Sequence, residues 1–269
     1  MPYEAEISRK NPGCFIFLVD QSESMEDPFG VGDKGHKKAE EVATILNKLL
    51  HNLSIRCAKS DAIYDYFHVG VIGYSEDKAR PILGGDLSGR FLVPISEIAN
   101  KPLRIEDGGD AKYPVWFDPY WKGGTPMCAA FKEALGIVKN WSGEHAKGFP
   151  PIVINLTDGE STDGDLVNSA KTLTEEGTDD GQVLLFNVHL STTKGNPIEL
   201  PSKPDKLPDK YAKQLFEASS QLTPFMISRA KELGMTVDDN SRGFIFNAQP
   251  LQVMNFLDIG TRPANIHLR

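Results

Sequence analysis

An unbroken run of apolar, β-prone side chains at residues 15–19, Phe-Ile-Phe-Leu-Val, constrains the fold of this chain more than any other feature. A strand with one face in water alternates apolar and polar residues, whereas a continuous apolar run is typical of a strand covered on both faces. Such strands belong to parallel sheets with helices on either side. The run stops at a carboxylate, Asp20, so this strand is predicted to bring a charged side chain to one edge of the sheet.

Asp20, Ser22 and Ser24 form a D-x-S-x-S pattern directly after this strand. Because they alternate with residues that point elsewhere, a loop that folds back from the strand can bring one carboxylate and two hydroxyls together. These are hard oxygen donors, which bind Mg²⁺ at about 2.0–2.1 Å in a near-octahedral shell that often retains waters. A phosphate-binding loop would instead be rich in Gly and carry a Lys. A plainer alternative is that Asp20 and Ser22 only cap the following helix.

Two later segments fit the same site. Gly123-Gly124-Thr125-Pro126 precedes an amphipathic pattern, which predicts a helix with Thr125 at its N-cap and Pro126 at its first position. A second, mostly apolar run, Ile-Val-Ile-Asn-Leu at residues 152–156, leads into Thr157-Asp158-Gly159. Alone, these segments are explained as a cap and a turn. In an open parallel sheet, however, the loops beyond the carboxyl ends of neighbouring strands meet in one crevice, so the three segments can form one site.

The remaining chain alternates predicted strands and helices, which is typical of a doubly wound α/β domain with a mostly parallel central sheet flanked by helices. Further strands are predicted over residues 66–74, 183–190 and 243–246, with a short edge strand at 91–93. Helices are predicted over residues 37–53, 163–176, 222–233 and 251–257. We expect one domain, residues 1–269, with insertions at about 100–122 and 191–210.

The first insertion, residues 100–122, is longer than most connections in a compact domain. It carries a group of aromatic residues before the Gly-Gly-Thr segment: Trp116, Phe117, Tyr120 and Trp121. Because Trp and Tyr are enriched in binding hot spots, a cluster delivered to the metal edge could form a partner-binding surface. The favoured alternative is that the rings cover an exposed flank of the sheet. The second insertion, with four prolines, is predicted to be an excursion rather than packed structure.

Composition limits the classes of partner and the cellular compartment that we expect for this protein. The net charge is −8, with no basic stripe, which argues against nucleic acid or an anionic membrane as the main partner. No segment is long and apolar enough to span a bilayer, and residues 1–10 have no apolar stretch of the kind that directs export. Cys14, Cys57 and Cys128 lack C-x-x-C spacing and are predicted to be free thiols in a reducing compartment. We therefore expect a cytoplasmic protein.

The three segments together resemble the von Willebrand factor type A (VWA) domain and its metal-ion-dependent adhesion site (MIDAS). The family pattern is D-x-S-x-S, then a Thr on a Gly-rich loop that enters a helix, then an Asp in a T-D-G-type turn. Every position of this pattern has its residue in the chain: Asp20, Ser22, Ser24, Thr125 and Asp158. The resemblance implies a Rossmann-like fold with a short antiparallel edge strand, direct coordination by the serines, and coordination by Thr125 and Asp158 directly or through water.

Neutral hydroxyls fill three of these five ligand positions, so the protein only partly neutralises a divalent cation, which stays electrophilic. One octahedral position can then take a Glu or Asp carboxylate from a partner protein. The sequence thus predicts a non-enzymatic, metal-dependent protein-interaction module that binds Mg²⁺, with Mn²⁺ and Ca²⁺ as alternatives. Resemblance to soluble, single-domain family members suggests a bacterial component of a stress or signalling system.

Two other functions remain open from the sequence. A haloacid-dehalogenase-type phosphatase would use Asp20 as a nucleophile. That family needs a second Asp two residues later as general acid, where this chain has Ser22, which cannot shuttle that proton at neutral pH. The other alternative is a scaffold protein in which the metal is purely structural.

Overall fold

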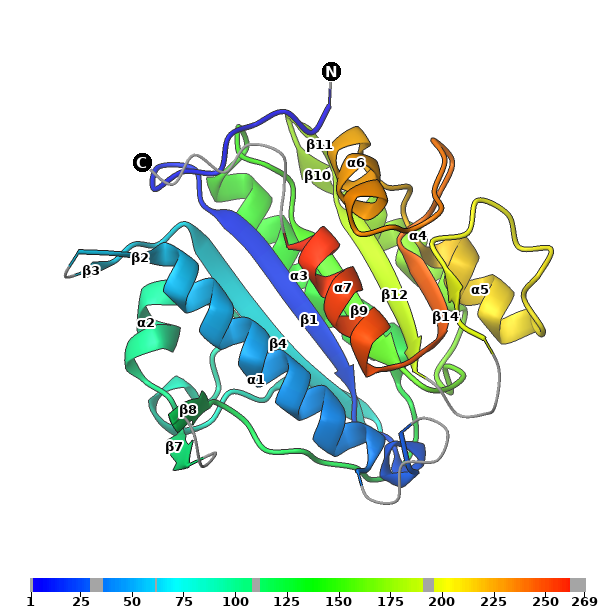
Figure 1. The fold of residues 1–269 in the computed structure, drawn as a ribbon, viewed down its shortest axis with the longest axis horizontal. Helices are drawn as coiled ribbons and strands as arrows, with labels where there is room; N and C mark the ends of the chain where they lie inside the picture. The colour runs from blue at the N-terminus through cyan, green and yellow to red at the C-terminus, as the bar shows by residue number, and fades with distance from the viewer. Residues whose placement is uncertain (1, 30–35, 61, 108–111, 191–195, 262–269) are drawn as a thin grey trace.

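The computed structural model describes residues 2–29, 36–60, 62–107, 112–190 and 196–261. Its main sheet has the strand order β13-β14-β12-β9-β1-β4-β5, and β6 also pairs with β4 (Figure 1). The bounds of its strands are β1 (Gly13–Asp20), β4 (Phe67–Ser75), β5 (Lys78–Pro81), β6 (Val93–Pro94), β9 (Ile152–Thr157), β12 (Leu184–Leu190), β13 (Ile198–Glu199) and β14 (Phe244–Ala248). The five strands from β14 to β4 are mutually parallel, which confirms the predicted doubly wound, mostly parallel class.

Helices cover both faces of this sheet, so β1 is buried along its whole length. One face packs against α1 (Lys38–Cys57), α2 (Ile95–Asn100), α6 (Pro224–Glu232) and α7 (Pro250–Gly260). The other packs against α3 (Met127–Glu144), α4 (Leu166–Thr174) and α5 (Lys210–Ala218). In Figure 1, α1 and α7 lie in front of the sheet and α3 lies behind it. The β1 side chains alternate between the two cores, with Phe15 and Phe17 in one and Ile16 and Leu18 in the other.

The structure also contains several short elements outside the main sheet and its covering helices. Short hairpins are formed by β2 (Ala58–Lys59) with β3 (Ala62–Ile63), β7 (Arg104–Asp107) with β8 (Lys112–Val115), and β10 (Gly177–Thr178) with β11 (Gly181–Gln182). Two 3₁₀ turns are η1 (Glu23–Glu26), directly after β1, and η2 (Gly85–Leu87).

The sheet carries more antiparallel strands than the single one predicted. The segment predicted at residues 91–93 contributes β6, and β5 and β13 pair antiparallel with β4 and β14. Each of these strands has only two to four residues, too short for a hydrophobic period to emerge. The helices α2 and α5 were also not predicted, whereas the predicted long strands and the other helices are present within a few residues of their expected bounds.

The aromatic residues of the first insertion are partly structural. Trp116 and Phe117 are buried, with exposed fractions of 1% and 3%. The Trp116 indole donates to the Ile98 carbonyl at 2.6 Å. Asn47 of α1 accepts from the Trp116 amide at 2.8 Å and donates to the Phe117 carbonyl at 3.2 Å. The partner-binding prediction is therefore wrong for these two residues, because burial and these hydrogen bonds place them in the core.

Tyr120 and Trp121 are only half-buried, and each lies under a cation. The Arg80 guanidinium is 5.0 Å from the Tyr120 ring centroid, and the Lys37 ammonium is 4.0 Å from that of Trp121. A partner-binding role for these two rings stays a prediction.

The second insertion is better packed than expected from its prolines. Residues 191–195 lie outside the described part of the chain. Beyond them, β13 pairs with β14, and Leu200 and Leu207 are buried in the core. The prediction of an unpacked excursion is thus wrong for this part, because Leu200 packs into the core on one face of the sheet and Leu207 into the core on the other.

Candidate metal centre

The loop after β1 folds back onto its own carboxylate. Asp20 and Ser22 are both buried, and the Ser22 amide donates to Asp20 Oδ1 at 2.8 Å. Ser22 occupies the N-cap position of η1, but its hydroxyl forms no capping hydrogen bond. Instead, Ser22 Oγ lies 3.1 Å from Ser24 Oγ. Helix capping therefore does not account for the side chain of Ser22, which the loop directs at the other serine.

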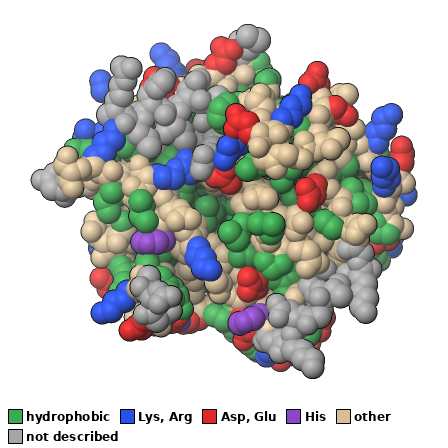
Figure 2. Space-filling model, viewed as in Figure 1, with side chains coloured by type: hydrophobic (Ala, Val, Ile, Leu, Met, Phe, Trp, Pro, Cys, Tyr) green, Lys and Arg blue, Asp and Glu red, His purple; other side chains and the backbone are tan. Residues whose placement is uncertain are grey.

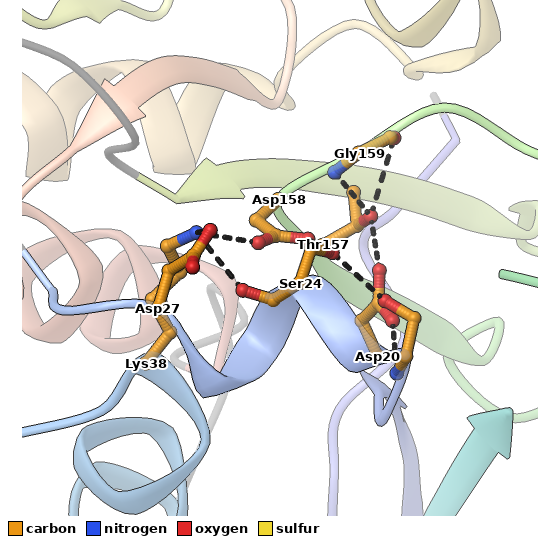
Figure 3. A network of polar contacts seen from close by, with 8 residues as sticks. Asp20, Ser24, Asp27, Lys38, Thr157, Asp158 and Gly159 are labelled. Carbon is orange, nitrogen blue, oxygen red and sulfur yellow. Dashed lines mark hydrogen bonds and ion pairs between the residues drawn. The ribbon is translucent and has the colours of Figure 1, made fainter. Parts of the chain in front are cut away.

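The loop after β9 completes this network (Figure 3). Because β1 and β9 are parallel neighbours, their carboxyl ends lie side by side at one edge of the sheet. Ser24 Oγ donates to Asp158 Oδ1 at 2.7 Å, and Thr157 Oγ1 donates to Asp20 Oδ2 at 2.6 Å. Thr157 Oγ1 also accepts from the Gly159 amide at 3.2 Å. Two carboxylates and two serine hydroxyls from distant parts of the chain thus lie in one connected cluster.

Thr125 is brought to this edge by backbone hydrogen bonds. The Glu23 amide donates to the Gly123 carbonyl at 2.9 Å, which joins the loop after β1 to the loop before α3. The Thr125 amide donates to Thr162 Oγ1 at 3.1 Å, and the Thr162 amide donates back to the Thr125 carbonyl at 3.0 Å. The three predicted segments are therefore tied to one another, with Thr125 itself buried.

The predicted N-cap of the helix after Thr125 is wrong, since α3 begins one residue later than expected and Pro126 occupies the cap position. The first backbone amides of α3, which have no partner within the helix, donate hydrogen bonds to a residue of another loop. Asp163 accepts from the amide of Cys128 at 2.9 Å through one carboxylate oxygen and from that of Ala129 at 2.8 Å through the other. With the helix capped by Asp163, the Thr125 side chain is not needed as a cap.

Lys38 is the residue of this site that the motif analysis missed. It is the first residue of α1 and has an exposed fraction of only 1%. Its ammonium lies 2.6 Å from Asp158 Oδ2, 3.2 Å from the Ser24 carbonyl and 3.5 Å from Asp27 Oδ2. The sequence did hold a signal, because Lys38 precedes Val42 by four positions and so lies on the apolar face of its helix.

Burial shapes the electrostatics of the cluster. Burial, followed by the neighbouring charge of Asp158, raises the pKa of Asp20 to about 6 against the opposing effect of hydrogen bonds from Ser22 and Thr157. His189, at the end of β12, has its pKa lowered to about 4, chiefly by burial. It accepts a hydrogen bond from the Asn247 amide through Nδ1 at 3.3 Å. A neutral imidazole at physiological pH therefore adds no positive charge to this edge.

The spacing of the oxygens suits an octahedral cation. In a shell with bonds of about 2.0–2.1 Å, adjacent ligand oxygens lie about 2.9 Å apart. The two serine hydroxyls are separated by 3.1 Å, and Ser24 Oγ is 2.7 Å from Asp158 Oδ1. Within the described ranges, no group of three or more His, Cys, Asp or Glu side chains could hold a metal. A metal at this edge would therefore depend on the hydroxyls as much as on the carboxylates.

The surface charges and the thiols relate to the predicted partners and compartment. Figure 2 shows Lys and Arg side chains scattered among Asp and Glu on the face that carries α1 and α7, without a basic stripe. The cysteines are free, with Cys14 and Cys57 buried and Cys128 half-buried. None of the described helices combines the length and the apolar character needed to cross a membrane.

No known family model matches this sequence, and no curated protein is similar enough to be matched. Solved structures with a related chain trace include the manganese-loaded TRAP protein of Plasmodium vivax, at 15% identity and a TM-score of 0.44 over 92% of this chain and 72% of that one. Proximal thread matrix protein 1 of the mussel byssus gives 13% identity and a TM-score of 0.43 over 96% of this chain and 48% of its own. The N-terminal domains of the pilus tip protein Mfa5 from Porphyromonas gingivalis give 12%, a TM-score of 0.30, and shares of 56% and 20%.

Proposed function

We propose that this chain is a VWA-type, metal-dependent protein-interaction module. Its MIDAS would hold a divalent cation, Mg²⁺ with Mn²⁺ or Ca²⁺ as alternatives, through the five motif residues, which are Asp20, Ser22, Ser24, Thr125 and Asp158. The observation that carries the proposal is the convergence of both serine hydroxyls and Asp158 at octahedral spacing, although Asp158 is 134 residues from Ser24 in the sequence. The cytoplasmic bacterial setting suggested by the family resemblance belongs to this proposal.

The chain's own residues would position the ion and leave part of its shell open. Asp20 is fixed by Ser22 and Thr157, so its carboxylate orients the loop as well as supplying charge. Ser24 is exposed, so the cluster is open to solvent next to this residue. When bound, the cation would supply an electrophilic centre that attracts a carboxylate. An acidic side chain of a partner protein could reach it from this side.

We propose no catalytic role for the site. Both carboxylate oxygens of Asp20 accept hydrogen bonds, and the side chain has no exposed surface. A phosphatase nucleophile must instead be reached by its substrate. Ser22 also stands where a phosphatase of this type needs a second Asp. These observations support Asp20 as a positioning and metal-binding group.

Isothermal titration with MnCl₂ tests the metal site. The wild type is expected to bind one ion, and Asp20→Ala should weaken binding by at least about tenfold, since loss of even an outer partner of a metal ligand has that effect. Asp239→Ala, at an exposed aspartate in the loop after α6, is the matched control and should bind as the wild type does. Equal affinity for all three proteins would disprove the site.

Partner capture then separates recognition from a structural metal. The tagged protein is incubated with lysate in Mg²⁺ or in chelator, with Asp20→Ala and Asp239→Ala in parallel. A partner that binds only when metal and Asp20 are both present supports the recognition function. A captured set that is unchanged by chelator and by Asp20→Ala, with both proteins folded, would favour the scaffold alternative.

A further inference from the structure

The cluster already contains a positive charge that belongs to the protein. Lys38 and Asp158 form an ion pair of 2.6 Å whose side chains have exposed fractions of 1% and 0%. Buried charges persist only when they are paired, so each of these groups depends on the other. The second carboxylate near the ammonium, Asp27, is 68% exposed and 3.5 Å away, which makes it the weaker partner. Lys38 is thus held chiefly by a proposed metal ligand.

The two oxygens of Asp158 are divided between different neighbours. Oδ1 accepts from Ser24 Oγ, on the side of the proposed cation, and Oδ2 is bound by the Lys38 ammonium. A divalent cation on Oδ1 would lie within a few ångströms of that ammonium, where like charges repel strongly because little water screens them. The ammonium also binds the Ser24 carbonyl at 3.2 Å, so it holds together the loops after β1 and β9 without any metal.

We propose that Lys38 is a built-in competitor of the divalent cation for Asp158, which keeps the metal-free cluster assembled and lowers its metal affinity. This inference rests on the proposed metal site. It predicts that removing the ammonium has effects of opposite sign on two quantities. The metal-free protein should become less stable, because Asp158 stays buried without a counter-charge. The metal should bind more tightly, because nothing competes with it for that carboxylate.

The test compares Lys38→Met with Lys37→Met. Methionine keeps an unbranched side chain of similar length without the charge. Lys37 is the neighbouring lysine, but it is partly exposed and pairs with Glu26 at 3.0 Å. Titration with MnCl₂ should show affinity at least about tenfold tighter for Lys38→Met than for the wild type, since the like charge is gone. Thermal unfolding in chelator should show a lower midpoint for Lys38→Met, with Lys37→Met matching the wild type in both measurements.

The outcomes separate this inference from the proposed function. If the wild type binds Mn²⁺ and a folded Lys38→Met binds it equally or more weakly, competition by Lys38 is disproved while the metal site stands. If neither protein binds Mn²⁺, the metal site fails and the inference fails with it. If only Lys38→Met binds, the inference is supported in its strongest form. Should Lys38→Met not fold, Lys38→Gln, which retains a hydrogen-bond donor without the charge, takes its place with the same expectations.

Discussion

At the scale of single residues, burial sets the titration of Asp20. Its folded-state pKa of about 6 lies above its ordinary value of 3.8, so the folded protein holds this proton more tightly than the unfolded chain does. The stabilisation that results from this tighter proton binding is fully present at pH values below the pKa of Asp20 in the unfolded chain. It is lost as the pH rises through the folded pKa, since the charged carboxylate is then buried in the metal-free cluster.

Asp20→Asn should therefore change how stability depends on pH. In chelator, raising the pH from 4 to 7 should lower the unfolding free energy of the wild type by about 2 kcal/mol relative to the variant, which keeps the shape of Asp20 without its charge. Urea unfolding at several pH values measures this difference. Parallel curves for the two proteins over that range would show that Asp20 is not the titrating group.

At the scale of elements, the N-terminus of α3 depends on a carboxylate from another loop. Asp163 satisfies two amides of α3 and comes from the same loop as Thr162, which holds Thr125. The cap and the proposed ligand loop are thus stabilised together. Asp165 caps α4 in the ordinary local way, through a hydrogen bond of 3.1 Å from the Asn168 amide.

Replacing these two caps should separate stability from metal binding. Asp163→Ala and Asp165→Ala should each lower the unfolding free energy by about 1 kcal/mol, the usual cost of a lost cap. Only Asp163→Ala should also weaken Mn²⁺ binding, because only that change loosens the loop that carries Thr125. Denaturant unfolding and calorimetric titration of both variants provide the comparison. Equal Mn²⁺ affinities would show that the α3 cap does not support the site.

The elements also show why some features were predictable and others were not. The runs at residues 15–19 and 152–156 predicted buried parallel strands correctly. A strand that is covered on both faces needs apolar side chains at nearly every position, and this pattern can be recognised without knowing the neighbouring strands. The strand β5 was missed, since its sequence, Lys-Ala-Arg-Pro, is polar and its place is set by pairing with β4. Lys38 and the Asp163 cap were missed for a related reason, since each binds a residue more than 30 positions away. The apolar periodicity of α1 places Lys38 on the buried face of the helix, but it does not identify Asp158 as the partner.

At the scale of the whole molecule, metal binding should appear as added stability. A ligand that binds only the folded state raises the unfolding free energy by about 2.7 kcal/mol at a concentration a hundred times its dissociation constant. We expect this gain for the wild type in Mn²⁺ and about half of it or less for Asp20→Ala at the same concentration, since that variant should bind at least about tenfold more weakly. Denaturant unfolding with Mn²⁺ and with chelator measures it. A similar gain in both proteins would indicate that Mn²⁺ binds elsewhere.

The N-terminal segment is fastened at the end of the sheet opposite to the proposed metal. The Tyr3 amide donates to the Asp180 carbonyl at 2.7 Å, between β10 and β11 and just before β12 begins. β1 then runs for eight residues, about 26 Å at 3.3 Å per residue, to reach Asp20 (Figure 1). A bead, a sensor surface or a fluorescent label attached ahead of Tyr3 would therefore leave the carboxyl edge turned outward, which makes that end of the chain the natural attachment point for oriented immobilisation.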